Sequence, residues 1–110
     1  MKLLVVIVNE KEKLEELLEG FVEIGIPGAT ILDSIGMGQY LKEEVPVFAG
    51  FRYLFEESRP FNKTVLSVIP DSLEEEAFRL IDRVLGGLSK PGAGIAFTLD
   101  VNRVEGLRSD

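Results

Sequence analysis

The sequence predicts one α+β domain whose elements follow the order βαββαβ. Its 110 residues are the usual length of a single domain. Two apolar runs of strand length, 2–8 and 63–69, are each followed by a charged segment whose apolar residues recur at helical spacing. An alternating segment after the first helix and an apolar segment near the end supply the remaining two strands.

The first half contains two of the strands and one helix. The Val/Ile/Leu run of residues 2–8 predicts a buried strand. The next segment predicts an α-helix, because one face of it carries Leu14, Leu17, Leu18, Phe21 and Val22. Gly25 ends this helix, and residues 26–28 form a turn. Alternation over residues 29–35 predicts the second strand.

The second half begins with the connection 39–62, which has no clean period and is long for a loop. Residues 63–69 predict the third strand. An Asp71 or Ser72 cap then opens the second helix, whose apolar face carries Leu73, Ala77, Leu80, Ile81, Val84 and Leu88. Glycines at 86 and 87 stop this helix, residues 90–94 form a loop, and residues 95–99 are the last strand. A polar tail, 100–110, follows.

This order, with right-handed crossovers, gives a ferredoxin-like sandwich: an antiparallel four-stranded sheet with two helices on one face. The other face of the sheet has no partner within the domain. Because it carries Leu, Val, Ile and Phe, we expect an oligomer to bury it.

Composition excludes several classes of function. With 12 basic and 19 acidic residues the net charge is −7, which argues against nucleic-acid binding. Cysteine and histidine are both absent, so Ser-His-Asp, Cys-His and HExxH sites are excluded, and we expect no catalytic residues and no metal site. The first apolar run is too short for a signal peptide or a membrane span, so a cytoplasmic protein without membrane insertion is expected.

The connection 39–62 is rich in aromatic residues: five of the nine in the chain lie between Tyr40 and Phe55. One interpretation is a loop that docks on a protein partner; its candidate contact residues are Phe48, Phe51, Arg52, Tyr53 and Phe55. The other is that the segment packs on its own subunits.

Four short segments resemble motifs of one family, the PII nitrogen-regulatory signalling proteins. Residues 23–30 (EIGIPGAT) resemble the EIGI-x-G-x-T entry to the second strand, and 36–38 (GMG) resemble the GFG at the base of the T-loop. Residues 68–71 (VIPD) resemble the VVPD before the second helix, and 92–97 (GAGIAF) resemble the GDGKIF of the B-loop. The element order extends the resemblance over the whole chain.

The resemblance implies a homotrimer that binds adenine nucleotides in clefts between subunits and signals to enzymes or transporters through the T-loop, here 39–62, without catalysis. It places the ligand at Thr30, Gly36, Met37, Gly38, Gln39, Lys90, Gly92, Ala93, Gly94 and Arg108. Paired glycines let backbone N–H groups approach a phosphate, although for each pair taken alone an ordinary turn is the stronger explanation.

Several departures from the family weaken a triphosphate site. Ile95 stands where the B-loop lysine would be, Gln39 follows GMG in place of an arginine, and Gly106 replaces one of two C-terminal arginines. Losing roughly three cations costs several kcal/mol, since each charged hydrogen bond contributes ~1.5–3 kcal/mol. We therefore expect no resident cofactor. Among AMP, ADP, ATP and cyclic nucleotides as effector, tight ATP binding is disfavoured, and a less charged nucleotide or a different small anion fits the remaining charge better.

Two further differences bear on function. Phe48 occupies the position of the family's modified tyrosine, and without a hydroxyl it excludes uridylylation there. The lost cations also leave a second hypothesis, a ligand-free structural or interaction trimer of the PII/CutA-like architecture. An enzymatic hypothesis would need a carboxylate pair such as Asp33 with Glu56, and nothing in the sequence places these two together.

Overall fold

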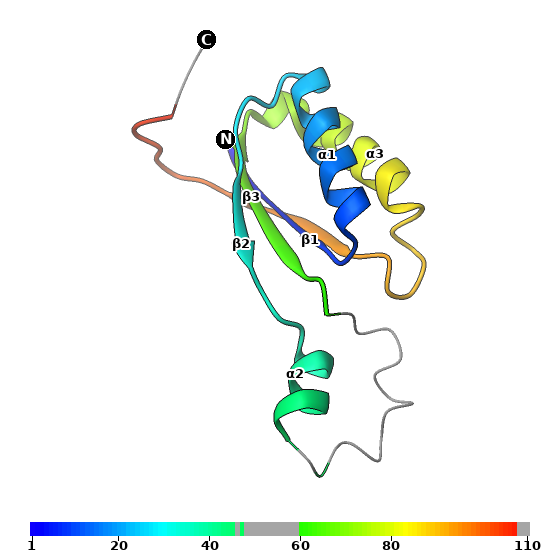
Figure 1. Cartoon of the computed structure of the whole chain (residues 1–110). Coiled ribbons are helices and arrows are strands. Elements are labelled where there is room, and N and C mark those ends of the chain that lie inside the picture. Colours follow the sequence, from blue (N-terminus) through cyan, green and yellow to red (C-terminus); the bar gives the residue numbers. More distant parts are fainter. Residues whose placement is uncertain (46, 48–59, 108–110) are drawn as a thin grey trace.

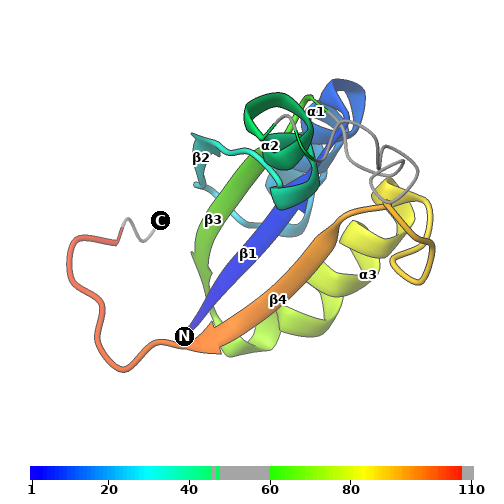
Figure 2. The ribbon, with the colours of Figure 1, turned by 90° about the horizontal axis from the view of Figure 1, so that it is seen from below.

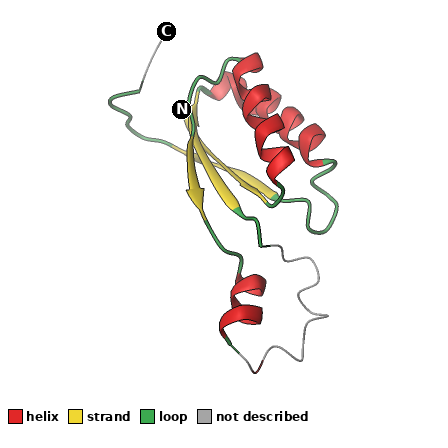
Figure 3. Ribbon diagram, in the orientation of Figure 1, coloured by secondary structure: helices red, strands yellow, loops and turns green. Residues whose placement is uncertain are grey.

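The computed structural model describes residues 1–45, 47 and 60–107, and it shows an α+β fold. In chain order the elements are β1 (Lys2–Val8), α1 (Lys11–Ile24), β2 (Thr30–Asp33), α2 (Met37–Glu44), β3 (Lys63–Ile69), the 3₁₀ turn η2 (Asp71–Leu73), α3 (Glu74–Leu85) and β4 (Ile95–Asp100). Figure 1 follows the chain through these elements, and Figure 3 colours them by type.

The four strands form one sheet in the order β2-β3-β1-β4, with every neighbouring pair antiparallel. Val6 on the central strand β1 pairs with Val65 on β3 and with Ala96 on β4. Both α1 and α3 lie on the same side of the sheet (Figure 2). The predicted ferredoxin-like arrangement of one chain is therefore confirmed.

The core lies between this sheet and the two helices. Leu4, Val6 and Val8 are fully buried because alternate residues of β1 point toward the helices. They pack with the apolar faces of both helices, whose buried residues are Leu14, Leu17, Phe21, Ala77, Leu80, Ile81, Val84 and Leu85. One predicted core residue is wrong: Val22 is 72% exposed, since it lies about 100° round the helix from Phe21.

Both long helices end in the same glycine motif. At the end of α1, Gly25 has a φ of 96°, its N–H donates to Val22 O at 3.2 Å, and the Ile26 N–H donates to Phe21 O at 2.8 Å. These two bonds define a Schellman motif, in which the following apolar residue packs back on the helix. Ile26, which the sequence placed in a turn, is accordingly a core residue, 2% exposed.

The start of α3 differs from its prediction. Neither Asp71 nor Ser72 caps it with a side-chain hydrogen bond; these residues form η2, and the α-helix begins at Glu74. Three glutamates in its first turn still complement the helix dipole.

The predicted loop 39–62 contains a helix that the sequence analysis missed. Helix α2 spans Met37–Glu44 and stands beyond the end of β2, away from the sheet (Figure 1). Two turns are too short for a helical period to show, and the glycines at 36 and 38 suggested a break. Strand β2 ends at Asp33, two residues before the predicted end. Residues 46 and 48–59 of this connection lie outside the described part.

The face of the sheet opposite the helices is apolar. The strand register places eleven side chains on it: Leu3, Val5, Ile7, Thr30, Leu32, Thr64, Leu66, Val68, Ile95, Phe97 and Leu99. We call this set the open face. Ile95, Phe97 and Leu99 are 54%, 44% and 53% exposed, and none of the described helices covers them. The uncovered face expected from the sequence is confirmed for the described residues.

Gly20 allows α1 and α3 to pack closely against each other. A Cβ there would lie 2.5 Å from Leu80 Cδ1, and Leu80 is itself buried. We predict that Gly20→Val lowers the free energy of unfolding by about 1–3 kcal/mol more than Glu15→Val, an exposed control on the same helix, because the packed core must shift. Urea unfolding at equal protein concentration measures both. Equal losses would show that the helices separate freely.

Candidate functional site

The two predicted glycine segments lie at the same end of the sheet but on opposite sides of it. Residues 36–39 follow β2, which ends where Asp33 pairs with Lys63. Residues 90–94 precede β4, which begins where Ile95 pairs with Ile7. Because β3 and β1 lie between them, strand spacing separates β2 from β4 by about 14 Å. Within one chain, the two candidate half-sites therefore do not meet.

The first half-site is a helix N-terminus rather than a glycine loop. Gly36, with a φ of −75°, is the N-cap of α2, and Met37, Gly38 and Gln39 form its first turn. No side chain caps this end, so first-turn N–H groups without intrahelical partners are available to an anion. The Gln39 side chain is buried and donates to Glu43 within the helix.

Three residues that the sequence analysis missed join the two ends of the long connection. Ser34 donates from its N–H to Asn62 O at 3.1 Å and from its hydroxyl to Asn62 Oδ1. Thr64 Oγ1 donates to Ser34 Oγ at 2.9 Å. A Cβ on Gly36 would lie 3.8 Å from Asn62 Nδ2, so this amide borders the first half-site.

The second half-site is a turn before β4. The Ala93 N–H donates to Lys90 O at 3.2 Å, and Gly92 has a φ of 76°. Proline and then glycine at the two central positions are typical of a type II β-turn. Asn9, which follows β1, donates from Nδ2 to Gly92 O at 2.7 Å.

Packing requires a glycine at position 94. Its φ is 135°, and a Cβ would lie 2.8 Å from Ile7 O and 2.9 Å from Leu85 Cδ1. The second glycine of this segment is therefore explained without a phosphate. A side chain at 94 would also displace backbone of the central strand.

The charges at this end of the sheet are mostly paired. Lys63 forms an ion pair with Asp33, and Lys13 contacts Glu10 at 3.2 Å and Leu85 O at 3.1 Å. Lys90 is exposed, and no hydrogen bond or ion pair of its side chain occurs among the described residues. It is the cation that the second half-site offers.

Thr30 lies apart from both glycine segments. It pairs with Leu66 in the middle of β3 and lines a cavity of about 880 Å³ on the open face, which also contacts Leu3, Val68 and Leu107. The structure thus does not bring Thr30 together with the glycines. The remaining predicted site residues, Arg108 and the loop residues Phe48, Phe51, Arg52, Tyr53 and Phe55, lie outside the described residues.

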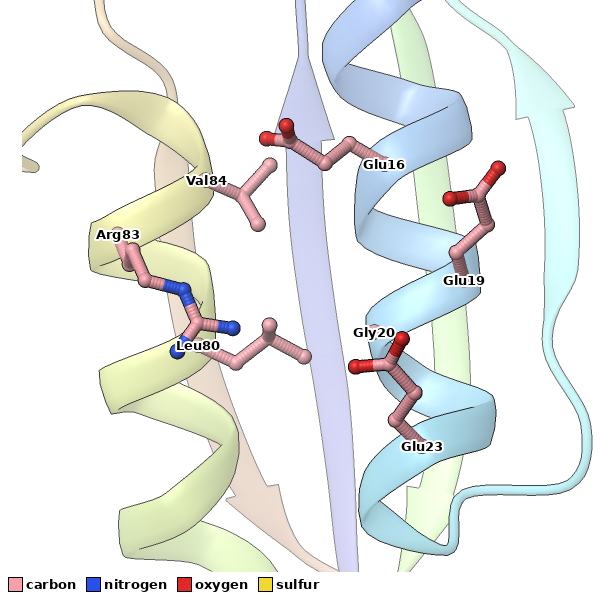
Figure 4. Close-up of a pocket in the computed structure, with 7 residues that line it drawn as sticks. All are labelled: Glu16, Glu19, Gly20, Glu23, Leu80, Arg83 and Val84. Carbon is pink, nitrogen blue, oxygen red and sulfur yellow. The ribbon is translucent and has the colours of Figure 1, made fainter.

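A second cavity, about 310 Å³, opens between α1 and α3 (Figure 4). Gly20, Leu80 and Val84 line it together with Arg83 and three carboxylates, Glu16, Glu19 and Glu23. No ion pair joins Arg83 to these glutamates. The excess of negative charge makes this groove unsuitable for a phosphate.

The perturbed titrating groups lie at the opposite end of the sheet. A hydrogen bond from Lys2 lowers the pKa of the Asp100 carboxyl, and the same bond raises the pKa of Lys2. Within residues 1–45, 47 and 60–107, no cluster of three or more acidic side chains could hold a metal ion. In the same ranges no helix is long and apolar enough to span a membrane.

The structure is a small α+β fold with two glycine-bearing segments at one end of its sheet, and a comparison with known families bears on it. The family model described as "Nitrogen regulatory protein P-II" matches residues 1–110. The chain therefore belongs to the P-II nitrogen regulatory protein family, and it is a PII-like regulatory, signal-transducing protein. No curated protein matches the sequence significantly.

The structural role of Gly94 gives a prediction. Gly94→Ala adds both a left-handed backbone strain and a clash, whereas Gly25→Ala, at a φ of 96° in open space, adds the strain alone. The strain costs about 1–2 kcal/mol in each variant, and the clash costs Gly94→Ala about 1–3 kcal/mol more. Urea unfolding of both variants measures the difference. Equal destabilisation would mean that β1 yields to the added methyl group.

Proposed function

We propose that this chain is the subunit of a homotrimeric PII-like regulator, which binds an adenine nucleotide as effector between subunits and signals through residues 39–62. The observation that carries the proposal is the separation of the two half-sites by about 14 Å within one chain. Family membership and the open face support the trimer.

A closed ring explains how two separated half-sites become one site. Copies related by threefold symmetry meet through different surfaces, so one side of a subunit adjoins the opposite side of the next. The β2 side carries the N-terminus of α2, and the β4 side carries the turn 90–94. Packing the open faces together brings these two segments from neighbouring copies toward one cleft.

The charge of such a cleft favours an effector with few phosphates. Uncapped N–H groups at the start of α2 and the Lys90 ammonium are its described positive groups. A helix N-terminus carries about half an elementary charge. One lysine and one helix end match AMP, ADP or a cyclic nucleotide better than ATP.

The signalling segment begins at the first half-site. Helix α2 starts at Gly36 and carries Met37 and Tyr40, which are 76% and 49% exposed. An effector that touches the first turn of α2 would therefore bias the connection through which a partner protein is contacted. The network of Ser34, Asn62 and Thr64 ties both ends of that connection to the sheet.

A ligand-free trimer of PII/CutA-like architecture is the second candidate. The packing of Gly94 against Ile7 and Leu85 favours it, because this glycine would be retained without any ligand. Both candidates are cytoplasmic interaction proteins rather than enzymes, without nucleic-acid or membrane partners. They differ in nucleotide binding and in the effector-dependent signalling that follows from it.

We predict that AMP, ADP or cyclic AMP raises the melting temperature of the protein more than ATP does. A ligand at 100 times its Kd adds about 2.7 kcal/mol to the free energy of unfolding. Removing the lysine charge by Lys90→Met should reduce the shift, whereas Lys11→Met, at the exposed start of α1, should not.

Thermal-shift titration of the whole chain with each nucleotide makes this measurement. The absence of a shift with all four nucleotides would contradict the sensor and support the ligand-free trimer. A shift that Lys90→Met leaves unchanged would remove the turn 90–94 from the site.

A further inference from the structure

Asn9 lies on a rigid junction between the central strand and the first helix. It follows Val8, the last residue of β1, and precedes Glu10, the N-cap of α1. β1 is paired on both sides, and the Leu14 N–H donates to Glu10 O at 3.1 Å. The half-buried Asn9 side chain is therefore projected from backbone that is fixed on either side.

The Asn9 side chain contacts the turn at its most adaptable residue. Its Nδ2 donates to Gly92 O at 2.7 Å, across 83 positions of sequence. The next N–H, that of Ala93, donates to Lys90 O at 3.2 Å. Since the C=O and N–H of a trans peptide point in opposite directions, these two bonds fix both ends of one peptide plane.

We propose that Asn9 is a positioning residue of the nucleotide site, holding the turn 90–94 in the conformation that receives a phosphate. The proposal rests on the proposed function and adds a residue to it. Glycine at 92 gives the turn wide conformational freedom, and the amide of Asn9 restricts it. Without this bond, the Gly92 carbonyl is free to rotate toward the ligand, where its oxygen would repel a phosphate.

The fold itself does not depend on this hydrogen bond. Gly94 packs against Ile7 and Leu85, and β4 pairs with β1 from Ile95 onward. Loss of the amide should therefore loosen the turn and leave the sheet and core in place. An apparent affinity falls in proportion to the fraction of protein in the binding conformation, so a turn that is ordered one-tenth of the time binds about tenfold more weakly.

Two variants separate hydrogen bonding from packing. Asn9→Asp keeps the shape of the side chain but replaces the donor with an acceptor that faces the Gly92 carbonyl, and Asn9→Ala removes the amide altogether. If Asn9 acts by packing, Asn9→Asp should weaken nucleotide binding less than Asn9→Ala does. If Asn9 acts as a hydrogen-bond donor, Asn9→Asp should weaken it more. Asn102→Asp, at an exposed position in the tail, is the control with the same change in charge.

The experiment titrates AMP and ADP into the full chain by calorimetry and follows amide hydrogen exchange in parallel. We expect Asn9→Asp to weaken the Kd about tenfold or more and Asn9→Ala to weaken it less. We also expect faster exchange confined to residues 90–94, a melting temperature close to that of the unmodified protein, and no change for Asn102→Asp.

The outcomes distinguish this proposal from the proposed function. If the unmodified protein binds nucleotide and both Asn9 variants retain that binding, the role of Asn9 alone is overturned. It is also overturned if Asn9→Ala binds nucleotide more weakly than Asn9→Asp does. If the unmodified protein binds none of AMP, ADP, cyclic AMP and ATP, each titrated in the same way, the proposed function fails. Amide hydrogen exchange in the Asn9 variants then tests Asn9 separately. Faster exchange at residues 90–94 supports the proposal that Asn9 orders the turn, and unchanged exchange overturns it.

Discussion

The proposed assembly and its nucleotide cleft depend on an apolar sheet face that one chain leaves uncovered. Helices α1 and α3 lie on one side only, and nine of the eleven side chains on the other side are Leu, Ile, Val or Phe. Fully burying one such side chain is worth about 1.5–3 kcal/mol, so contact between several of them in neighbouring copies is strongly favoured. In the proposed trimer, each edge of the sheet would be completed by another copy, and this would explain why the candidate half-sites lie at separate edges.

Glycine serves several physical purposes in this chain, and most of them need no ligand. Gly20 lets two helices approach, Gly25 and Gly86 end helices in the left-handed region, and Gly94 avoids the carbonyl of Ile7. A glycine motif read from sequence is therefore weak support for phosphate binding until its steric surroundings are known. In the turn before β4, the proposed ligand contact rests on Gly92 and its bond to Asn9 rather than on Gly94.

Most of the fold could be predicted from the sequence, because burial on one side imposes a regular period. Continuous apolar runs located β1 and β3, alternation located β2, and the helical period located α1 and α3. Helix α2 escaped detection, since two turns that stand away from the sheet need no apolar stripe. The core position of Ile26 follows from the Schellman motif. A glycine followed by an apolar residue at the end of a helix is the sequence pattern that could have predicted it.

The site was less predictable than the fold. Asn9, Ser34 and Asn62 act through hydrogen bonds between segments far apart in the chain, and no period marks such residues. The family motifs located the glycine segments, yet strand order alone showed that these lie on opposite sides of the sheet. Thr30 matched a motif and faces a cavity elsewhere on the open face.

The molecular mass in solution tests most directly whether neighbouring copies complete the open face. Light scattering on the full chain at micromolar concentration should give three times the 12.2 kDa of one subunit, with or without nucleotide. A stable 12.2 kDa monomer would contradict burial of the open face between copies, and with it a nucleotide cleft shared between subunits.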